Sequence, residues 1–285
     1  MCEKNKFFRC GKFHLSLERP LIMGIVNLTP DSFSGDGCWR QTKNERQAAV
    51  RFALEYARKQ WEAGADILDV GAESTRPGAT PISLEEERAR LIPVLEEMRD
   101  WGIPVSVDTY KPEVMRRALA AGASMINDIH ALRTPDALEA VSDSDCGICL
   151  MHMQGEPRNM QQKPLYRDVI SDVRGFLAER VAACRRHGIA SERLTLDPGF
   201  GFGKTLAHNI ELFRNLPEIT ADGLPLLVGV CRKTMLGELT GRPVNERQSA
   251  SLAAAVVAAE KGAAIIRTHD VAACKDALAV WAALA

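Results

Sequence analysis

Short apolar runs alternate with longer amphipathic runs along almost the whole chain, which is the pattern of repeated βα units. We count eight such pairs in the sequence. The predicted strands lie near residues 21–26, 66–70, 104–107, 124–128, 147–151, 194–196, 225–230 and 263–267. The predicted helices lie near residues 45–63, 84–101, 112–121, 135–141, 168–187, 206–215, 246–261 and 271–284.

Eight βα units with buried, β-branched strands favour a closed parallel barrel, and the alternative is an open doubly wound sheet. No linker or low-complexity tract interrupts the series. The expected fold class is therefore α/β, with a single (β/α)8 TIM-barrel domain over residues 1–285. Residues 1–20 precede the first predicted strand, and we expect them to form an N-terminal extension that packs on the barrel.

The charge balance argues against nucleic acid or a membrane as partner. The 285 residues include 36 Lys plus Arg and 37 Asp plus Glu, so the net charge provides no field that attracts polyanions or acidic lipids. No apolar run reaches the ~18 residues that a membrane span needs. The cysteines are scattered from Cys2 to Cys274, which indicates reduced thiols rather than a disulfide framework. We therefore expect a cytoplasmic protein that holds small molecules by local charges.

Polar residues follow the apolar runs in nearly every unit. They are Asn27, the stretch 73–76, Asp108, Asn127, His152, Asp197, Lys233, Arg267 and His269. Each one alone means little, because Asp and Asn are ordinary helix caps and turn formers after a strand. In a parallel barrel, however, the carboxyl ends of all strands meet at one mouth, where active sites lie. The set therefore predicts one site built from several loops.

Arginine and histidine side chains at this mouth suggest a phosphate-bearing ligand. Arg267 and His269 are two residues apart at the end of the last predicted strand, so an extended chain puts both side chains on one face. Together with Arg76 they could hold a phosphate group by paired hydrogen bonds. The alternative is that each arginine makes only a structural pair with a carboxylate.

Carboxylates and an amide at three other strand ends suggest a different partner. Asp108, Asn127 and Asp197 supply acceptors and one amide donor. This set suits a flat heterocycle with an amino-amidine edge, for which a buried carboxylate is an especially good acceptor. The site is therefore expected to recognise two chemically distinct groups.

Two further features receive structural interpretations. Residues 199–205 resemble a phosphate-binding loop, but the motif would need glycine where Pro198 stands. We interpret the stretch as a tight turn that brings Phe202 close to a ligand. Asp66 and Asp69 fall within a predicted strand, and we expect structural roles for both.

Longer motifs point to a family. Residues 24–34 read Gly-Ile-Val-Asn-Leu-Thr-Pro-Asp-Ser-Phe-Ser, and residues 69–78 read Asp-Val-Gly-Ala-Glu-Ser-Thr-Arg-Pro-Gly. These stretches resemble the two signatures of the dihydropteroate synthases. Residues 151–155 (Met-His-Met-Gln-Gly), 197–204 (Asp-Pro-Gly-Phe-Gly-Phe-Gly-Lys) and 231–233 (Cys-Arg-Lys) agree with the same family. The resemblance extends from residue 21 to residue 271.

The resemblance implies condensation of 6-hydroxymethyl-7,8-dihydropterin diphosphate with 4-aminobenzoate, which releases diphosphate and forms 7,8-dihydropteroate. A magnesium ion assists, and the family pattern places Asn27 on it. The pterin can stabilise positive charge on its exocyclic methylene, so diphosphate can leave before the amine attacks. No activated nucleophile is evident, and we expect no covalent enzyme intermediate.

The resemblance also implies roles for the matching residues. Around the diphosphate it places Thr75, Arg76, Arg267 and His269. Around the pterin it places Asp108, Asn127, Met151, Asp197 and Lys233. Beside the aminobenzoate it places Thr75, Pro77, Phe202 and Cys231. The catalytic candidates are the cationic or ionisable residues, because positive charge stabilises the leaving group. They are Arg76, Lys233, Arg267 and His269.

Two departures from the family pattern affect these expectations. The usual Ser-Arg-Lys reads Cys-Arg-Lys, so Cys231 puts a larger and weaker hydrogen-bonding group beside the aminobenzoate. The first loop reads Ser-Gly-Asp-Gly at residues 34–37, where the family commonly has Ser-Asp-Gly-Gly. Asp36 is therefore only a candidate for a residue that closes the site.

The motifs also distinguish this function from two alternatives. A pterin-dependent methyltransferase would share the pterin pocket but not both the Ser-Thr-Arg-Pro loop and the Arg-Lys motif. A pterin-binding protein without activity would not need the set Asn27, Arg76, Lys233, Arg267 and His269. The family usually pairs through late helices of the barrel, which implies a homodimer here.

Overall fold

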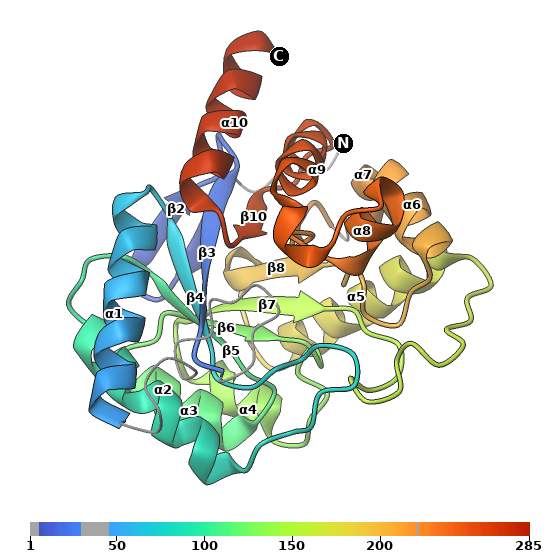
Figure 1. Ribbon diagram of the computed structural model, residues 1–285. Helices are drawn as coiled ribbons and strands as arrows, with labels where there is room; N and C mark the ends of the chain where they lie inside the picture. Colours follow the sequence, from blue (N-terminus) through green and yellow to red (C-terminus); the bar gives the residue numbers. More distant parts are fainter. Residues whose placement is uncertain (1–5, 30–45, 221) are drawn as a thin grey trace.

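The chain folds around a parallel β-barrel (Figure 1). The computed structural model describes residues 6–29, 46–220 and 222–285. Within these residues, eight parallel strands form one sheet in the order β8-β7-β6-β5-β4-β3-β10-β9. An isolated parallel bridge between Leu196 and Leu226 joins the two edges of the sheet, so the barrel is nearly closed. The predicted α/β fold class and TIM-barrel architecture are confirmed.

The strands lie close to their predicted ranges, with one clear exception. They are β3 (Leu21–Asn27), β4 (Ile67–Gly71), β5 (Val105–Asp108), β6 (Met125–Asp128), β7 (Gly147–Met151), β8 (Leu194–Asp197), β9 (Leu227–Val228) and β10 (Ile265–Thr268). The strand expected over residues 225–230 is wrong in length, since β9 has only 2 residues. Pro225 has no N–H for a ladder and Gly229 has no side chain to pack, which limits strand pairing at both ends.

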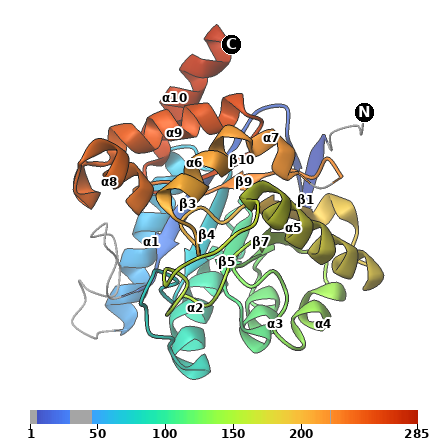
Figure 2. The ribbon, with the colours of Figure 1, turned by 90° about the vertical axis from the view of Figure 1, so that its right-hand side faces the viewer.

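Helices surround the barrel on the outside (Figure 2). They are α1 (Arg46–Glu62), α2 (Leu84–Met98), α3 (Pro112–Ala120), α4 (Ala137–Ser142), α5 (Val169–Arg186), α6 (Leu206–Arg214), α7 (Leu216–Ile219), α8 (Thr234–Thr240), α9 (Gln248–Glu260) and α10 (Val271–Leu284). Helices α7 and α8 were not expected from the sequence, because one or two turns carry too few apolar repeats to recognise. In the described parts of the chain, no helix combines the length and apolarity required to cross a membrane.

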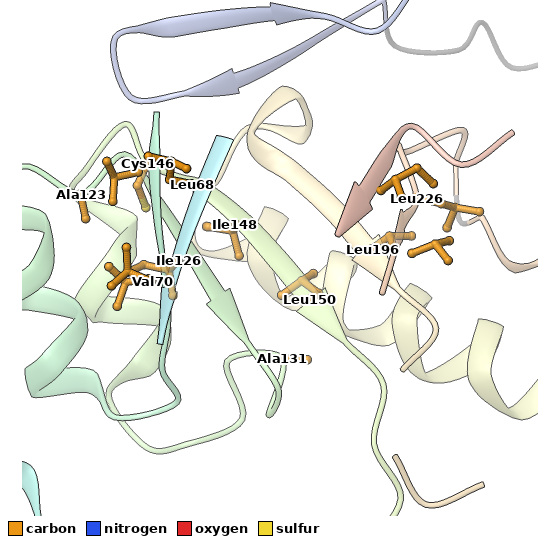
Figure 3. Close-up of a cluster of buried hydrophobic side chains, with 14 of the residues drawn as sticks. Leu68, Val70, Ala123, Ile126, Ala131, Cys146, Ile148, Leu150, Leu196 and Leu226 are labelled. Carbon is orange, nitrogen blue, oxygen red and sulfur yellow. The ribbon is translucent and has the colours of Figure 1, made fainter. Parts of the chain in front are cut away.

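Apolar side chains on the outward faces of the strands pack against these helices. Figure 3 shows Val70, Ile126 and Leu150 in this layer, on three strands of the barrel. The facing side of α1 buries Ala53 and Ala57, which are four residues apart and therefore on one helix face. Small side chains there allow the helix to lie close to the sheet.

An N-terminal hairpin covers the amino ends of the barrel strands. Strands β1 (Phe7–Cys10) and β2 (Phe13–Ser16) pair antiparallel, and the sequence pattern did not predict them as strands. Phe8 is 0% exposed and shares an apolar cluster with Met23 and Ile67 from the barrel interior. Arg9 forms an ion pair with Glu192 at 3.1 Å. The hairpin thus contacts the barrel strands through apolar groups, and the segment before β8 through a charged pair.

The barrel interior changes character along each strand. Side chains alternate between the two faces of a strand, so every second residue points inward. In β3, Met23 belongs to the apolar cluster at the amino ends, whereas Ile25 and Asn27 line a cavity at the carboxyl ends. In β4, Ile67 is followed two residues later by the buried Asp69. In these two strands, the polar side chains of Asn27 and Asp69 therefore lie on the carboxyl side of the apolar cluster.

Candidate active site

A cavity of about 780 Å³ opens at the carboxyl ends of the strands. Its volume falls in the range of small-molecule sites, roughly 300–1,000 Å³. All of the residues to which the family resemblance gives a role line it, and they come from several loops. They are Asn27, Thr75, Arg76, Pro77, Asp108, Asn127, Met151, Asp197, Phe202, Cys231, Lys233, Arg267 and His269. Asp36 lies outside the described residues, so its expected role in closing the site stays a prediction.

A cluster of charges occupies the floor of the cavity. The Arg267 guanidinium donates from Nε to Asp69 Oδ2 at 2.7 Å and from Nη2 to Asp108 Oδ2 at 3.3 Å. Asn127 Nδ2 also donates to Asp69 Oδ2, at 3.3 Å. These contacts join β10 to β4 and β5, and β6 to β4, inside the barrel. Arg267 therefore has the carboxylate partners that its structural interpretation requires, and it also lines the cavity.

Two carboxylate oxygens in this cluster have no hydrogen-bond partner among the described residues. They are Oδ1 of Asp69 and Oδ1 of Asp108, both fully shielded from solvent. A buried acceptor without a partner costs free energy, on the order of 1–3 kcal/mol. Asp108 lines the cavity, so its side chain is a candidate contact for a ligand with N–H donors.

Burial shifts the ionisation of the groups around the cavity. Burial raises the pKa of Asp108 to about 7, against the opposing effect of the Arg267 charge. Burial also raises the pKa of Asp197, against the charge of Lys233. The pKa of Lys233 is lowered to about 8, chiefly by burial. Perturbed groups of opposite sign in one cavity are typical of functional sites.

The glycine-rich turn after β8 is held by side chains along its whole length. The carbonyls of residues 199, 200, 201, 202 and 203 each accept a hydrogen bond from a side chain. The donors are Lys204 to residues 199 and 202, Lys233 to 200, Gln161 to 201 and Tyr166 to 203. The turn therefore presents Phe202 to the cavity from a rigid backbone, in agreement with its expected interpretation as a tight turn.

Two glycines of this turn allow it to approach the segment after β7. Gly199 and Gly203 have φ of 69° and 63°, in the left-handed region. A Cβ at Gly199 would lie 1.8 Å from the carbonyl oxygen of His152, and one at Gly203 would lie 2.3 Å from that of Gln154. No side chain fits at either position.

Lys204 is the buried centre of this turn. Its Nζ lies 2.9 Å from Gly199 O, 3.1 Å from Phe202 O and 2.9 Å from His152 Nδ1. A charged Lys204 donates in the last contact, and His152 then accepts through a neutral ring. Burial and then the Lys204 charge lower the pKa of His152 to about 2, consistent with that role. His152 therefore supports the turn and does not line the cavity.

The turn after β9 is tied to the end of β10. Arg232 has a φ of 57°, and its Nη2 donates to Asp270 Oδ1 at 2.8 Å. The Cys231 sulfur lies 3.3 Å from Nδ1 of His269. Burial raises the pKa of the Cys231 thiol, so the neutral thiol is the form beside His269. The ion pair fixes Cys231 and Lys233 relative to His269.

Asn27 ends β3 and lines the same cavity as Arg267 and His269. No cluster of three His, Cys, Asp or Glu side chains that could hold a metal occurs among the described residues. Mg²⁺ commonly keeps several waters and binds through one or two protein oxygens plus substrate phosphates. The single amide oxygen of Asn27, in one cavity with Arg267 and His269, suits an ion held mainly by water and a phosphate ligand. It suits an ion held by protein ligands alone less well.

The chain is similar to known proteins over most of its length. The family described as "Pterin binding enzyme" matches residues 23–269. The dihydropteroate synthase of Neisseria meningitidis serogroup C is 51% identical, over 97% of this chain and 97% of its own length. The chain belongs to the dihydropteroate synthases of the pterin-binding enzyme family.

Solved structures of the same family superpose closely. The Burkholderia cenocepacia dihydropteroate synthase complexed with 7,8-dihydropteroate has a TM-score of 0.87 and 50% identity, and the match covers 98% of this chain and 96% of that one. The Xanthomonas albilineans dihydropteroate synthase with 4-aminobenzoic acid has a TM-score of 0.89 and 48% identity, with 98% of each chain covered.

Several residues at this family site were missed by reasoning from the sequence. Asp69 has the structural role expected of it, and its partners are Asn127 and Arg267, which line the cavity. The sequence did not identify these partners, although an aspartate on the inward face of a fully buried strand requires one. Lys204 carried no comparable signal, because its acceptors come from backbone carbonyls and from His152 in another loop. Asp66 does have a structural role, accepting from the Ile22 amide at 2.8 Å.

Proposed function

We propose that this chain condenses 6-hydroxymethyl-7,8-dihydropterin diphosphate with 4-aminobenzoate to give 7,8-dihydropteroate and diphosphate. The observation that carries the proposal is one cavity that combines acceptors for a heterocycle with cations for a diphosphate. The relatives at 50% identity and above are named for this reaction. The family structures carry 7,8-dihydropteroate and 4-aminobenzoic acid.

The pterin is assigned to the floor of the cavity. Asp197 and Asp108 accept from the N–H groups of its amino-amidine edge, and Asn127 adds a donor and an acceptor. Both carboxylates and the Asn127 amide line the cavity, which supports this assignment. Met151 contributes an apolar wall, together with Ile129 and Met160. The ammonium of Lys233 donates to the ring system.

The diphosphate is assigned to the rim beside β10 and the loop after β4. Arg76, Arg267 and His269 stabilise the negative charge that grows on the leaving oxygen, and Thr75 donates a hydrogen bond. A magnesium ion bound by Asn27 and the diphosphate oxygens would neutralise part of the same charge as a Lewis acid. Arg76, Arg267 and His269 are the catalytic candidates, together with Lys233.

The aminobenzoate is assigned to the space between two turns. Phe202 offers a ring face, and Lys233 Nζ lies 4.7 Å from the centre of that ring. Thr75 and Pro77 approach from the loop after β4, and Cys231 from the turn after β9. The amine then faces the methylene carbon of the pterin.

The bond changes require no covalent enzyme intermediate. The C–O bond between the methylene and the diphosphate breaks, and its electron pair leaves with the oxygen. The amine lone pair of aminobenzoate forms the new C–N bond, and the nitrogen releases a proton to diphosphate or water. The chain orients both partners at van der Waals distance, which supplies a large part of the rate enhancement.

The test is diphosphate release by the purified protein with magnesium, with and without 4-aminobenzoate, followed by detection of dihydropteroate. Aminobenzoate-dependent product is expected. Pterin binding without product would support a non-catalytic pterin-binding protein, and transfer of a methyl group instead would support a pterin-dependent methyltransferase.

Asp197→Asn should weaken pterin diphosphate binding by about 10- to 100-fold, because it removes a charged acceptor. The exposed Asp222→Asn is the matched control.

We also propose that the protein is a cytoplasmic homodimer. Val257 on α9 and Val280 and Leu284 on α10 are exposed apolar side chains on two packed late helices, which suits burial against a second copy. The described cysteines, such as Cys10 and Cys184, are free thiols, as is usual in a reducing compartment. Light scattering of the wild-type chain and of Val280→Glu would test the dimer.

A further inference from the structure

The loop after β4 carries three of the site residues, Thr75, Arg76 and Pro77. It leaves the barrel at Glu73 and rejoins regular structure at Ser83, which caps α2 through the Glu86 amide. A loop of this length needs ties at its base if its side chains are to hold one position.

One lysine ties both ends of this loop. Lys111 Nζ donates to Glu73 Oε2 at 2.5 Å, at the start of the loop, and to the Ile82 carbonyl at 2.8 Å, at its end. The Ile82 amide in turn donates to Glu73 Oε2 at 3.1 Å. Residues 73 and 82 are therefore joined both directly and through the ammonium group.

The same ammonium anchors the loop to the rest of the molecule. Its third contact is Glu87 Oε2 of α2, at 2.6 Å. The Glu87 side chain is 1% exposed and Lys111 itself only 17%, so little water competes for these contacts. The three protons of a charged lysine are thus matched by three acceptors.

The lysine is also close in sequence to the pterin pocket. Asp108 ends β5 and lines the cavity, and the three residues that follow all join the same network. Thr109 donates to Glu87 Oε1 at 2.7 Å and Tyr110 donates to Glu73 Oε1 at 2.7 Å. The position of the loop after β4 is thereby coupled to the strand that carries Asp108.

We propose that Lys111 is a positioning residue for the reaction, which fixes the entry of Thr75 and Arg76 into the cavity by closing the base of residues 73–82. The inference rests on the proposed function. Lys111 does not line the cavity among the described residues, so it acts through the loop rather than on substrate. None of the assigned pterin contacts lies on this loop itself.

The experiment compares Lys111→Met, Lys111→Arg and the control Lys261→Met. Lys261 also donates to a main-chain carbonyl, that of Arg214 at 2.9 Å, but away from the site. Lys111→Met should lower kcat/KM for the condensation about 10- to 100-fold, because small misplacement of positioning groups has effects of this size. The Kd for a pterin without diphosphate should change less than threefold. Lys111→Arg should recover part of the rate, and Lys261→Met should behave as wild type.

Lys111→Met leaves two buried carboxylates without their cation and can reduce the folded fraction. The double variant Lys111→Met/Glu87→Gln removes one of these charges, while Glu73 keeps its bonds from Tyr110 and Ile82. It should fold and show the same split between turnover and pterin binding. Hydrogen exchange should accelerate in residues 74–82 and stay unchanged in the barrel strands.

Each outcome decides the proposal. Selective loss of turnover with faster exchange in the loop supports it. Wild-type kinetics in the folded double variant overturn it, as does a proportional loss of turnover and pterin binding, which indicates a general structural role. If the wild-type chain itself forms no dihydropteroate, the proposed function fails, and the exchange measurement still reports whether Lys111 holds the loop.

Discussion

The two ends of the barrel use the same strands for opposite purposes. At the amino ends, Phe8 of the hairpin seals an apolar cluster that includes Met23 and Ile67. Two residues further along β4, the interior carries Asp69 at 0% exposure, paired with Arg267. In barrels of this kind the amino-terminal face contributes stability and the carboxyl-terminal face contributes chemistry. In β4, the change from an apolar to a charged side chain occurs between two successive inward-facing residues, Ile67 and Asp69.

The buried charges at the carboxyl ends of the strands reduce the stability of the folded state. Buried ions lose hydration, and their mutual attraction offsets that loss only when geometry and hydrogen bonding are good. Among the described residues, Oδ1 of Asp69 and Oδ1 of Asp108 have no hydrogen-bond partner, so this compensation is incomplete there. The apolar cluster at the amino ends, here called the base, is therefore expected to supply more of the stability than the cavity at the carboxyl ends, here called the mouth. Variants at the base should mainly change stability, and variants at the mouth should mainly change activity.

The largest effect is expected at the base. Phe8→Ala should lower the free energy of unfolding by about 3–5 kcal/mol, through lost burial and the cavity left behind. The kcat/KM per folded molecule should stay within twofold of wild type. Urea unfolding and kinetics at a low temperature check both parts. Phe7→Ala, at a side chain that is 56% exposed, is the control and should change stability little; an equal loss in both would remove the distinction.

The next effect is expected at the mouth. Arg267→Gln should lower kcat/KM by about 10²- to 10³-fold, as when another charge-stabilising donor is lost. Stability should also fall, because Asp69 and Asp108 then lose their cation. Steady-state kinetics on the folded fraction measure the first effect. Arg242→Gln, on an exposed arginine, should leave kinetics unchanged, and a similar rate for both variants would contradict the assigned role.

Above about pH 8, activity should fall as the pH rises, while the contribution of Lys233 to stability should increase. Lys233 has a pKa lowered to about 8 by burial, so kcat/KM should fall about tenfold per unit above that pH as the ammonium loses its proton. In the unfolded chain the pKa is ~10.4. Between these values the unfolded state binds more protons, and the contribution of Lys233 to stability should rise with pH. Lys233→Arg should lack the alkaline decline; its persistence would assign the decline to another group.

The smallest effect is expected at Cys231. Its thiol lies beside His269 rather than in the charge cluster, so Cys231→Ser should change the KM for 4-aminobenzoate by only a few-fold, on the order of 1 kcal/mol or less. The KM for the pterin diphosphate should change less. Competition with a sulfonamide provides a second measurement. Equal changes for both substrates would place residue 231 outside the aminobenzoate pocket.

Much of the fold was predictable because it depends on neighbours in the sequence. Strand β7 covers the predicted residues 147–151, since a bounded run of apolar residues is a local property. The hairpin β1–β2 was missed because its strands have 4 residues each and carry mixed polarity. Residues such as Asn127 and Asp197 were predictable as site residues because they follow strands and match family motifs, although their roles remain predictions.

Local pattern and motif thus determined which elements form, in what order, and which chemical groups stand at the strand ends. The pairings between those groups came only from the tertiary structure. Asp69 and Arg267 are 198 positions apart, and Lys111 and Glu73 are 38 apart. The physical reason is that periodicity and turn chemistry act over a few residues. A buried ion pair depends on barrel closure, strand register and packing, which bring distant residues within hydrogen-bonding distance.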